Sequence, residues 1–68
     1  MPGKNVIVYT TNQLYQAEML KNILADHGIF SFIINKQDSN YHFGDIEVYV
    51  NQDDVIRAKM LIEKFETN

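Results

Sequence analysis

The stretch LADHGIFSFIIN, residues 24–35, marks the point where a predicted helix ends and a predicted strand begins. Gly28 supplies the left-handed backbone conformation that ends many helices, and Ile29 is placed for the hydrophobic contact that accompanies this kind of ending. The run that follows is almost continuously apolar, which is typical of a strand buried on both faces. The spacing therefore predicts a helix over 13–27 and a strand over 29–35.

Three further segments complete a β-α-β-β-α pattern around this boundary. Residues 5–10, NVIVYT, are rich in β-branched side chains and predict a first strand. Residues 45–51, DIEVYVN, alternate apolar and polar side chains as a half-buried strand does. Asn51 is a natural N-cap for a last helix. The apolar stripes predicted for the two helices are Leu14, Ala17, Leu20, Ile23 and Leu24 in the first, and Val55, Ala58, Leu61, Ile62 and Phe65 in the second.

This order of elements predicts the topology of the sheet. A helix that connects the first two strands makes them parallel, with a right-handed connection. The hairpin that follows makes the third strand antiparallel to the second, and we place the third strand between the other two. The prediction is an α+β, ferredoxin-like βαββα fold with a three-stranded sheet of order 1-3-2 and both helices on one face, lacking the usual final strand. Residues 1–68 are expected to form this single domain.

Composition narrows the classes of partner and site. The chain has 68 residues, a net charge of −3 and no cysteine, which excludes disulfides and thiolate metal sites. Its six Lys and Arg residues are scattered, which disfavours binding to nucleic acid. The apolar run near the N-terminus is too short for a signal peptide, and no stretch approaches the about 20 apolar residues of a membrane span. We therefore expect a cytoplasmic protein without membrane association.

The predicted sheet carries apolar side chains on both faces, although both predicted helices cover the same face. The other face therefore has apolar side chains that no helix covers. If the apolar residues of strand 45–51 face the helices, the opposite face carries the remaining aromatic side chains. Strand 29–35 can turn either face to the helices, and the small Ser31 fits best beneath one; the alternative would expose Ile29 and Ile33. Monomers seldom expose so large a patch, so we expect it to be covered by a second copy, another protein partner, a ligand, or the loop side chains Tyr41 and Phe43. The predicted interaction face consists of Ile7, Tyr9, Phe30, Phe32, Ile34 and Tyr49.

The loop NKQDSNYHFGD, residues 35–45, gathers most of the polar chemistry of the chain. A histidine with carboxylates is a possible metal or acid–base cluster, but the spacing of His42 and its acidic neighbours matches no recurrent metal motif. Ser39 has no nucleophile-elbow motif. The other histidine, His27, lies at the far end of strand 29–35, which is about 23 Å long, so the two histidines cannot act together within one chain. We therefore predict no catalytic residue, no metal site and no cofactor, and assign turn chemistry to the loop. If the loop binds a ligand, the candidate residues are Asp38, Ser39, Tyr41, His42 and Gly44.

One known family is similar to this chain in three segments, VYTTNQLYQAEMLKNILADHGI, NKQDSNYHFGDIEVYV and DDVIRAKMLI. It is the small bacterial family labelled "putative prokaryotic signal-transducing protein", a domain of unknown function. The resemblance spans nearly the whole chain and implies a ferredoxin-like fold related to the PII (GlnB-like) group, whose members sense small molecules and oligomerise. This chain lacks the long loops and further strand with which that group binds nucleotide, so nucleotide binding is assigned to no residue. The marks of the resemblance are Ala17-Glu18, Leu24 with Gly28-Ile29, Asp38-Ser39 with Tyr41 and Gly44, and Val50 with Asp54 and Ala58.

Together these features predict a non-enzymatic regulatory or protein-interaction module that forms homo-oligomers through the interaction face. The alternative is a small-ligand sensor that uses the 36–44 loop. A third hypothesis, a nucleic-acid binder with an aromatic sheet platform, is disfavoured because Glu47 is expected on the same face.

Overall fold

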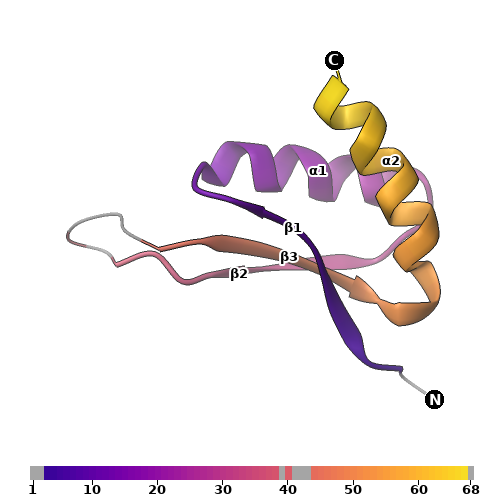
Figure 1. Ribbon diagram of the computed structural model, residues 1–68, viewed down its shortest axis with the longest axis horizontal. Helices are drawn as coiled ribbons and strands as arrows, with labels where there is room; N and C mark the ends of the chain where they lie inside the picture. Colours follow the sequence, from indigo (N-terminus) through magenta and orange to yellow (C-terminus); the bar gives the residue numbers. More distant parts are fainter. Residues whose placement is uncertain (1–2, 39, 41–43, 68) are drawn as a thin grey trace.

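The computed structural model describes residues 3–38, 40 and 44–67, and these follow a β-α-β-β-α path (Figure 1). The sheet has the order β1-β3-β2, and β3 is antiparallel to both of its neighbours. This arrangement confirms the predicted α+β, ferredoxin-like fold with strand order 1-3-2. The elements are β1 (Asn5–Thr11), α1 (Leu14–Asp26), β2 (Ser31–Asn35), β3 (Ile46–Asn51), the 3-10 turn η1 (Gln52–Asp54) and α2 (Val55–Thr67).

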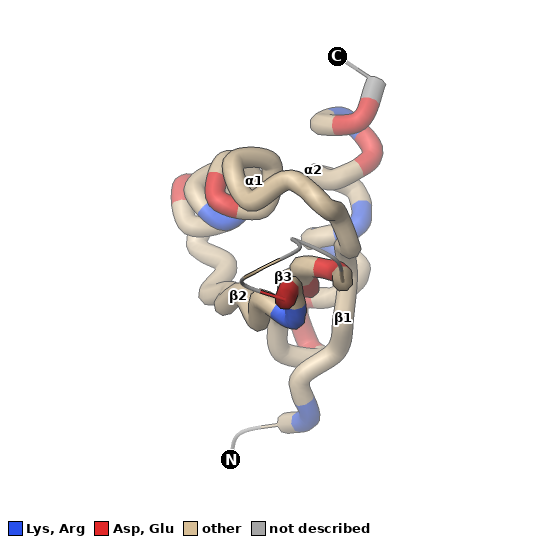
Figure 2. The backbone as a smooth tube through the Cα atoms, turned by 90° about the vertical axis from the view of Figure 1, so that its left-hand side faces the viewer, with Lys and Arg blue, Asp and Glu red and all other residues tan. Residues whose placement is uncertain are grey.

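The described elements form two layers, with α1 and α2 together on one side of the sheet (Figure 2). The core lies between the layers, and the apolar side of β3 forms its centre because β3 is the middle strand. The other side of the sheet has no helix over it within the described residues. The buried apolar side chains are Ala17, Leu20, Leu24, Ile29, Ile46, Val48, Val50, Ala58 and Ile62.

The end of α1 is closed in the way that the sequence predicts. Gly28 has a φ of 76°, in the left-handed region. Its N–H donates to the carbonyl of Ala25 at 3.0 Å, and the N–H of Ile29 donates to the carbonyl of Leu24 at 2.9 Å. These two bonds form a Schellman motif. Ile29 is only 1% exposed, so the chain enters β2 already held in the core.

Strand β2 turns its Ser31 side toward the helices, which is the alternative that the small size of Ser31 favoured. Ser31 is 3% exposed and pairs with the buried Val50. Because side chains alternate along a strand, Phe32 and Ile34 lie on the opposite side of the sheet. The predicted faces of β2 are therefore confirmed.

The predicted position of Tyr9 is wrong, because β1 contains a bulge. Ile7 pairs with Tyr49. Tyr9, two residues later, pairs with Val48, so β1 advances by two residues while β3 advances by one. The extra residue turns Tyr9 to the helix side of the sheet, where its ring meets Phe65 edge-on with centroids 5.9 Å apart. Tyr9 therefore packs against the core and does not belong to the interaction face.

Leu14 also departs from its predicted place in the apolar stripe of α1. Its side chain is 45% exposed, whereas Leu20 and Leu24 are fully buried. At about 100° per residue, Leu14 lies about 90° around the helix from the centre of the buried side. The sheet covers only the middle of the stripe, so the buried face of α1 is narrower than the sequence pattern.

Asn51 caps the last helical segment, as predicted. Its side-chain oxygen accepts a hydrogen bond from the N–H of Asp53 at 2.9 Å. Asp53 and Asp54 place negative charge in the first turn, which the dipole of a helix favours. From this turn α2 rises steeply, and its C-terminal end extends away from the sheet and past α1 (Figure 1).

Candidate functional site

The sheet surface opposite the helices carries a cluster of apolar and aromatic side chains, which we call the open face. It contains Ile7, Phe32, Ile34 and Tyr49, and the alternation of β2, continued one residue before its start, adds Phe30. Phe30, just before β2, is 77% exposed, and Ile7 and Ile34 are 42% and 37% exposed. Since both described helices lie on the other side of the sheet, these side chains are in contact with solvent in the single chain.

Phe32 and Tyr49 form the centre of the open face. They lie opposite each other in the register of β2 and β3, and their rings stack with centroids 5.2 Å apart and planes 3° from parallel. Ile7 pairs with Tyr49 from the β1 side. An apolar row therefore crosses the whole sheet. Aromatic side chains of this kind are enriched in the buried centres of protein interfaces.

An acidic and a basic side chain border this row. The Tyr49 hydroxyl donates to the Glu47 carboxylate at 2.8 Å, and the same carboxylate oxygen lies 3.3 Å from Nζ of Lys36. The hydrogen bond from Tyr49 lowers the pKa of Glu47, with a further contribution from Lys36, while desolvation acts in the opposite direction. The same hydrogen bond raises the pKa of Tyr49. The network therefore favours an ionised Glu47 and a neutral Tyr49.

Replacement of Glu47 by glutamine is expected to remove a pH-dependent part of the stability. The pKa of Glu47 is lowered from 4.5, so its contribution is present above pH 4.5 and is lost as the pH falls through the lowered pKa. The pKa of Tyr49 is raised from 10.0, so its contribution is present below pH 10.0 and is lost as the pH rises through the raised pKa. The difference in free energy of unfolding between wild type and Glu47→Gln should be constant near neutral pH and shrink at both extremes.

Urea denaturation followed by circular dichroism, at one fixed protein concentration, measures this difference between about pH 3 and about pH 11. Glu18→Gln removes the same charge from the exposed side of α1 and is the control. The role of the network would be contradicted by a Glu47→Gln difference that is no more pH-dependent than that of Glu18→Gln.

The predicted loop site lies only partly within the described residues. Ser39, Tyr41 and His42 are outside them, so the proposed ligand role of the loop stays a prediction. The Asp38 carboxylate accepts a hydrogen bond from the N–H of Asn40 at 2.7 Å, which is turn chemistry of the expected kind. Within the described part of the chain, no group of three or more His, Asp or Glu side chains could hold a metal ion.

Backbone contacts hold the base of this loop. The N–H of Lys36 donates to the carbonyl of Asp45 at 2.9 Å, which extends the pairing of β2 with β3. Gly44 has a φ of 111° and lies so close to the Lys36 carbonyl that a Cβ there would be 2.5 Å from its oxygen. The Gln37 side chain donates to the carbonyl of Asn12 at 2.9 Å. The loop base is therefore joined to the connection between β1 and α1.

A second exposed apolar surface lies between α1 and α2, and the sequence interpretation missed it. Tyr15 and Met19 are 60% and 50% exposed and line a cavity there together with Ile23. The sequence pattern places both residues outside the apolar stripe predicted for α1, and it predicts no function for them. The available signal was their spacing of four residues, which puts Tyr15, Met19 and Ile23 in one row along the helix.

A comparison with protein-family profiles matches residues 6–66 to the family described as "putative prokaryotic signal transducing protein". The chain belongs to this family. The match begins within β1 and ends within α2, so it includes the residues of the open face and those between the helices. A comparison with curated proteins and another with solved structures give no match. Over the residues that the structure describes, neither helix is long and apolar enough to cross a membrane.

Proposed function

We propose that this member of the signal-transducing family is a non-enzymatic module that self-associates through the open face. The observation that carries the proposal is the apolar row of Ile7, Tyr49 and Phe32, which both helices leave uncovered. Phe30 extends the same surface with 77% of its side chain exposed. Apolar surface in water is unfavourable by about 25 cal/mol per Å², and a contiguous patch of it on a monomer usually marks an interaction site.

A second copy of the chain is the occupant that the charges on this face favour. A two-fold interface brings identical surfaces together, so an excess of charge of one sign would repel its own copy. On the open face Lys36 and Glu47 form an ion pair at 3.3 Å and so compensate each other. A chain of 68 residues also buries only about 60% of its unfolded surface by itself, and a second copy over the open face would enlarge the core.

Self-association gives such a module a way to transmit a signal without catalysing a reaction. An input that binds the monomer and the dimer with different affinities changes the proportion of the two states. The open face is buried in the dimer and accessible in the monomer, so other proteins can distinguish the two states by this surface.

Sedimentation velocity from about 10 μM to about 1 mM tests the proposal. The wild type is expected to show a monomer–dimer equilibrium that shifts with concentration. Phe30→Glu places an unpaired charge in the interface and should raise the dissociation constant at least about tenfold, or about 1.4 kcal/mol.

Ile56→Glu is the matched control for this experiment. Ile56 and Phe30 are both 77% exposed, but Ile56 lies on α2, in the helix layer and away from the open face. The two variants therefore introduce the same charge at equal exposure, one beside the start of β2 and the other on α2. A wild type that stays monomeric at the highest concentration contradicts the proposal, and so does an Ile56→Glu variant that dissociates as readily as Phe30→Glu. Circular dichroism checks that both variants are folded.

A further inference from the structure

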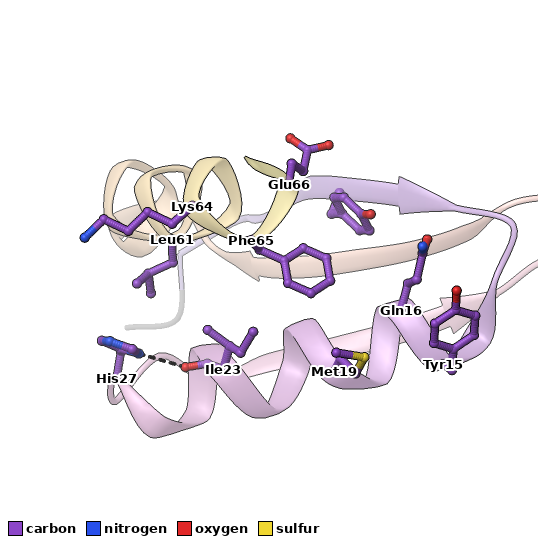
Figure 3. A pocket seen from close by; sticks show the side chains of 10 residues that line it. Tyr15, Gln16, Met19, Ile23, His27, Leu61, Lys64, Phe65 and Glu66 are labelled. Atoms are coloured by element: carbon purple, nitrogen blue, oxygen red, sulfur yellow. Dashed lines mark hydrogen bonds between the residues drawn. The ribbon is translucent and has the colours of Figure 1, made fainter. Parts of the chain in front are cut away.

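A cavity of about 780 Å³ opens between α1 and α2, in the helix layer (Figure 3). Its volume lies within the range of about 300–1,000 Å³ that is typical of small-molecule sites, which are lined mainly by apolar and aromatic side chains with a few polar groups. We call it the helix groove. Its apolar lining consists of Tyr9, Tyr15, Met19, Ile23, Leu61 and Phe65.

The helix groove exists because the two helices diverge. The C-terminal part of α2 rises away from α1, so the facing sides of the two helices do not close on each other (Figure 1). On α1 the facing side carries a row with a spacing of four residues, from Tyr15 through Met19 to Ile23. On α2 it carries Leu61 and Phe65 at the same spacing, and both side chains point toward α1 (Figure 3).

The chemistry of this lining suits a flat aromatic body. Phe65 meets Tyr9 edge-on, with planes at 81°, so two rings at nearly a right angle form one wall of the groove. Met19 lies on the opposite wall and is 50% exposed, so its thioether is available to a bound ring. Sulfur–aromatic contacts and edge-to-face ring contacts both stabilise a bound ring beyond the burial of its apolar area.

One end of the groove is polar and carries positive charge. His27 and Lys64 lie at that end, on α1 and α2 respectively (Figure 3). Nδ1 of His27 is 2.9 Å from the carbonyl of Ile23, and a hydrogen bond to a carbonyl requires Nδ1 to be the donor. In the neutral ring Nε2 of His27 is then an acceptor, and it donates to an anionic group only when the ring is protonated, so Lys64 carries the positive charge of this end. The carboxylate of Glu66, which also borders the groove, points away from α1 (Figure 3).

A smaller hollow of about 220 Å³ adjoins the same end of the groove, since both are lined by His27, Leu61 and Lys64. Arg57 lies beside this second hollow and also pairs with Asp54 at 3.1 Å. Two cationic side chains and a histidine thus surround this end, whereas the opposite end holds Tyr15 and the uncharged Gln16 (Figure 3). This asymmetry favours a ligand with a negative group at one end.

We propose that the helix groove binds a small amphiphilic anion, with a flat aromatic body between Met19 and Phe65 and a single anionic group at the end formed by His27 and Lys64. This inference is independent of self-association, because the groove lies in the helix layer and the open face lies on the other side of the sheet.

Two fluorescent dyes of similar shape test separately how the anionic group and the aromatic body of a ligand contribute to binding. One is 1-anilinonaphthalene-8-sulfonate, and the other is N-phenyl-1-naphthylamine, which lacks the sulfonate. The anionic dye is expected to bind with a dissociation constant below about 1 mM and about two- to fivefold more tightly than the neutral dye, which is the effect expected of an exposed charge contact. Equal affinity of the two dyes overturns the proposal, and so does the absence of binding, which is the result expected if the groove accepts only a protein segment.

The methionines report where the dye binds. The chain has three, Met1, Met19 and Met60, of which Met19 lines the groove and Met60 lines the adjoining hollow. With ¹³C-methyl methionine in the wild-type protein, the anionic dye should shift the Met19 signal most and give nuclear Overhauser contacts from its ring protons to that methyl group. A saturating dye that leaves the Met19 signal unmoved overturns the proposal, and this readout does not depend on the folding of any variant.

Matched pairs of substitutions complete the test. Met19→Glu should weaken the anionic dye more than about tenfold, and Lys64→Gln about two- to fivefold. Their controls are Ile56→Glu and Lys59→Gln on α2, which line neither hollow and should leave the affinity unchanged. Phe30→Glu should also retain dye binding, which separates this result from self-association. A loss of affinity in Phe30→Glu or Ile56→Glu equal to that in Met19→Glu would show that the dye binds elsewhere.

Discussion

Replacement of Leu24 by alanine is expected to leave most molecules unfolded. Leu24 is fully buried in the core, and its carbonyl accepts the hydrogen bond from Ile29 that closes α1. Truncation of a buried leucine costs about 2–5 kcal/mol, through the lost transfer free energy and the cavity that is left. Domains below about 70–80 residues rarely have more than about 3–5 kcal/mol of stability, so this loss removes most or all of it.

Leu14→Ala is the matched control, because it makes the same change in the same helix at a side chain that is 45% exposed. It should lower the free energy of unfolding by less than about 1 kcal/mol. Circular dichroism without denaturant should show loss of the helical signal for Leu24→Ala alone, and urea denaturation at one protein concentration should place Leu14→Ala near the wild type. Equal losses in the two variants would contradict the orientation of α1 against the sheet.

The second large effect is expected for Gly44→Ala, at the base of the β2–β3 loop. The added Cβ would lie 2.5 Å from the carbonyl oxygen of Lys36 and 3.1 Å from Cα of Gln37, and both of these atoms belong to the backbone. The φ of 111° is also one that an alanine rarely adopts. Since neither the clash nor the dihedral angle can be relieved by a side-chain rotation, the substitution should destabilise the chain by more than about 2 kcal/mol.

Gly28→Ala separates the two causes, because Gly28 also has a positive φ, of 76°, but no atom lies within 4 Å of the position that its Cβ would take. It should cost only about 1 kcal/mol, the strain of the left-handed conformation alone. Urea midpoints of the two variants provide the comparison, and amide exchange of Lys36 reports directly on its hydrogen bond to Asp45. The predicted close approach at the loop base is wrong if Gly44→Ala is no less stable than Gly28→Ala.

Much of the fold could be predicted because its signals are local. The Schellman motif depends on one glycine and the apolar residue after it, and Gly28 with Ile29 form it as expected. The cap at Asn51 depends on a side chain and an N–H two residues away. The faces of β2 followed from the size of Ser31, since a small side chain leaves room beneath a helix.

The candidate site could be predicted in part, for the same reason. Phe32 and Ile34 are on the open face because alternation along β2 is unbroken. Tyr9 was assigned to the wrong face because β1 reads as a continuous apolar run, in which a bulge leaves no visible break in the pattern. The helix groove was not predicted at all, because its lining joins residues of α1 and α2 that are about 40 positions apart in the chain.

By itself, the sequence determined the order of the elements, the end of α1, the capped start of the last helical segment and the faces of β2. Each of these depends on contacts within a few residues or on the regular alternation of a strand. Only the tertiary structure decided the bulge that turns Tyr9 toward Phe65, the exposure of Leu14 and the divergence of α2 from α1. These features are set by how separate elements pair and pack, because strand register and helix inclination depend on partners that no single segment contains.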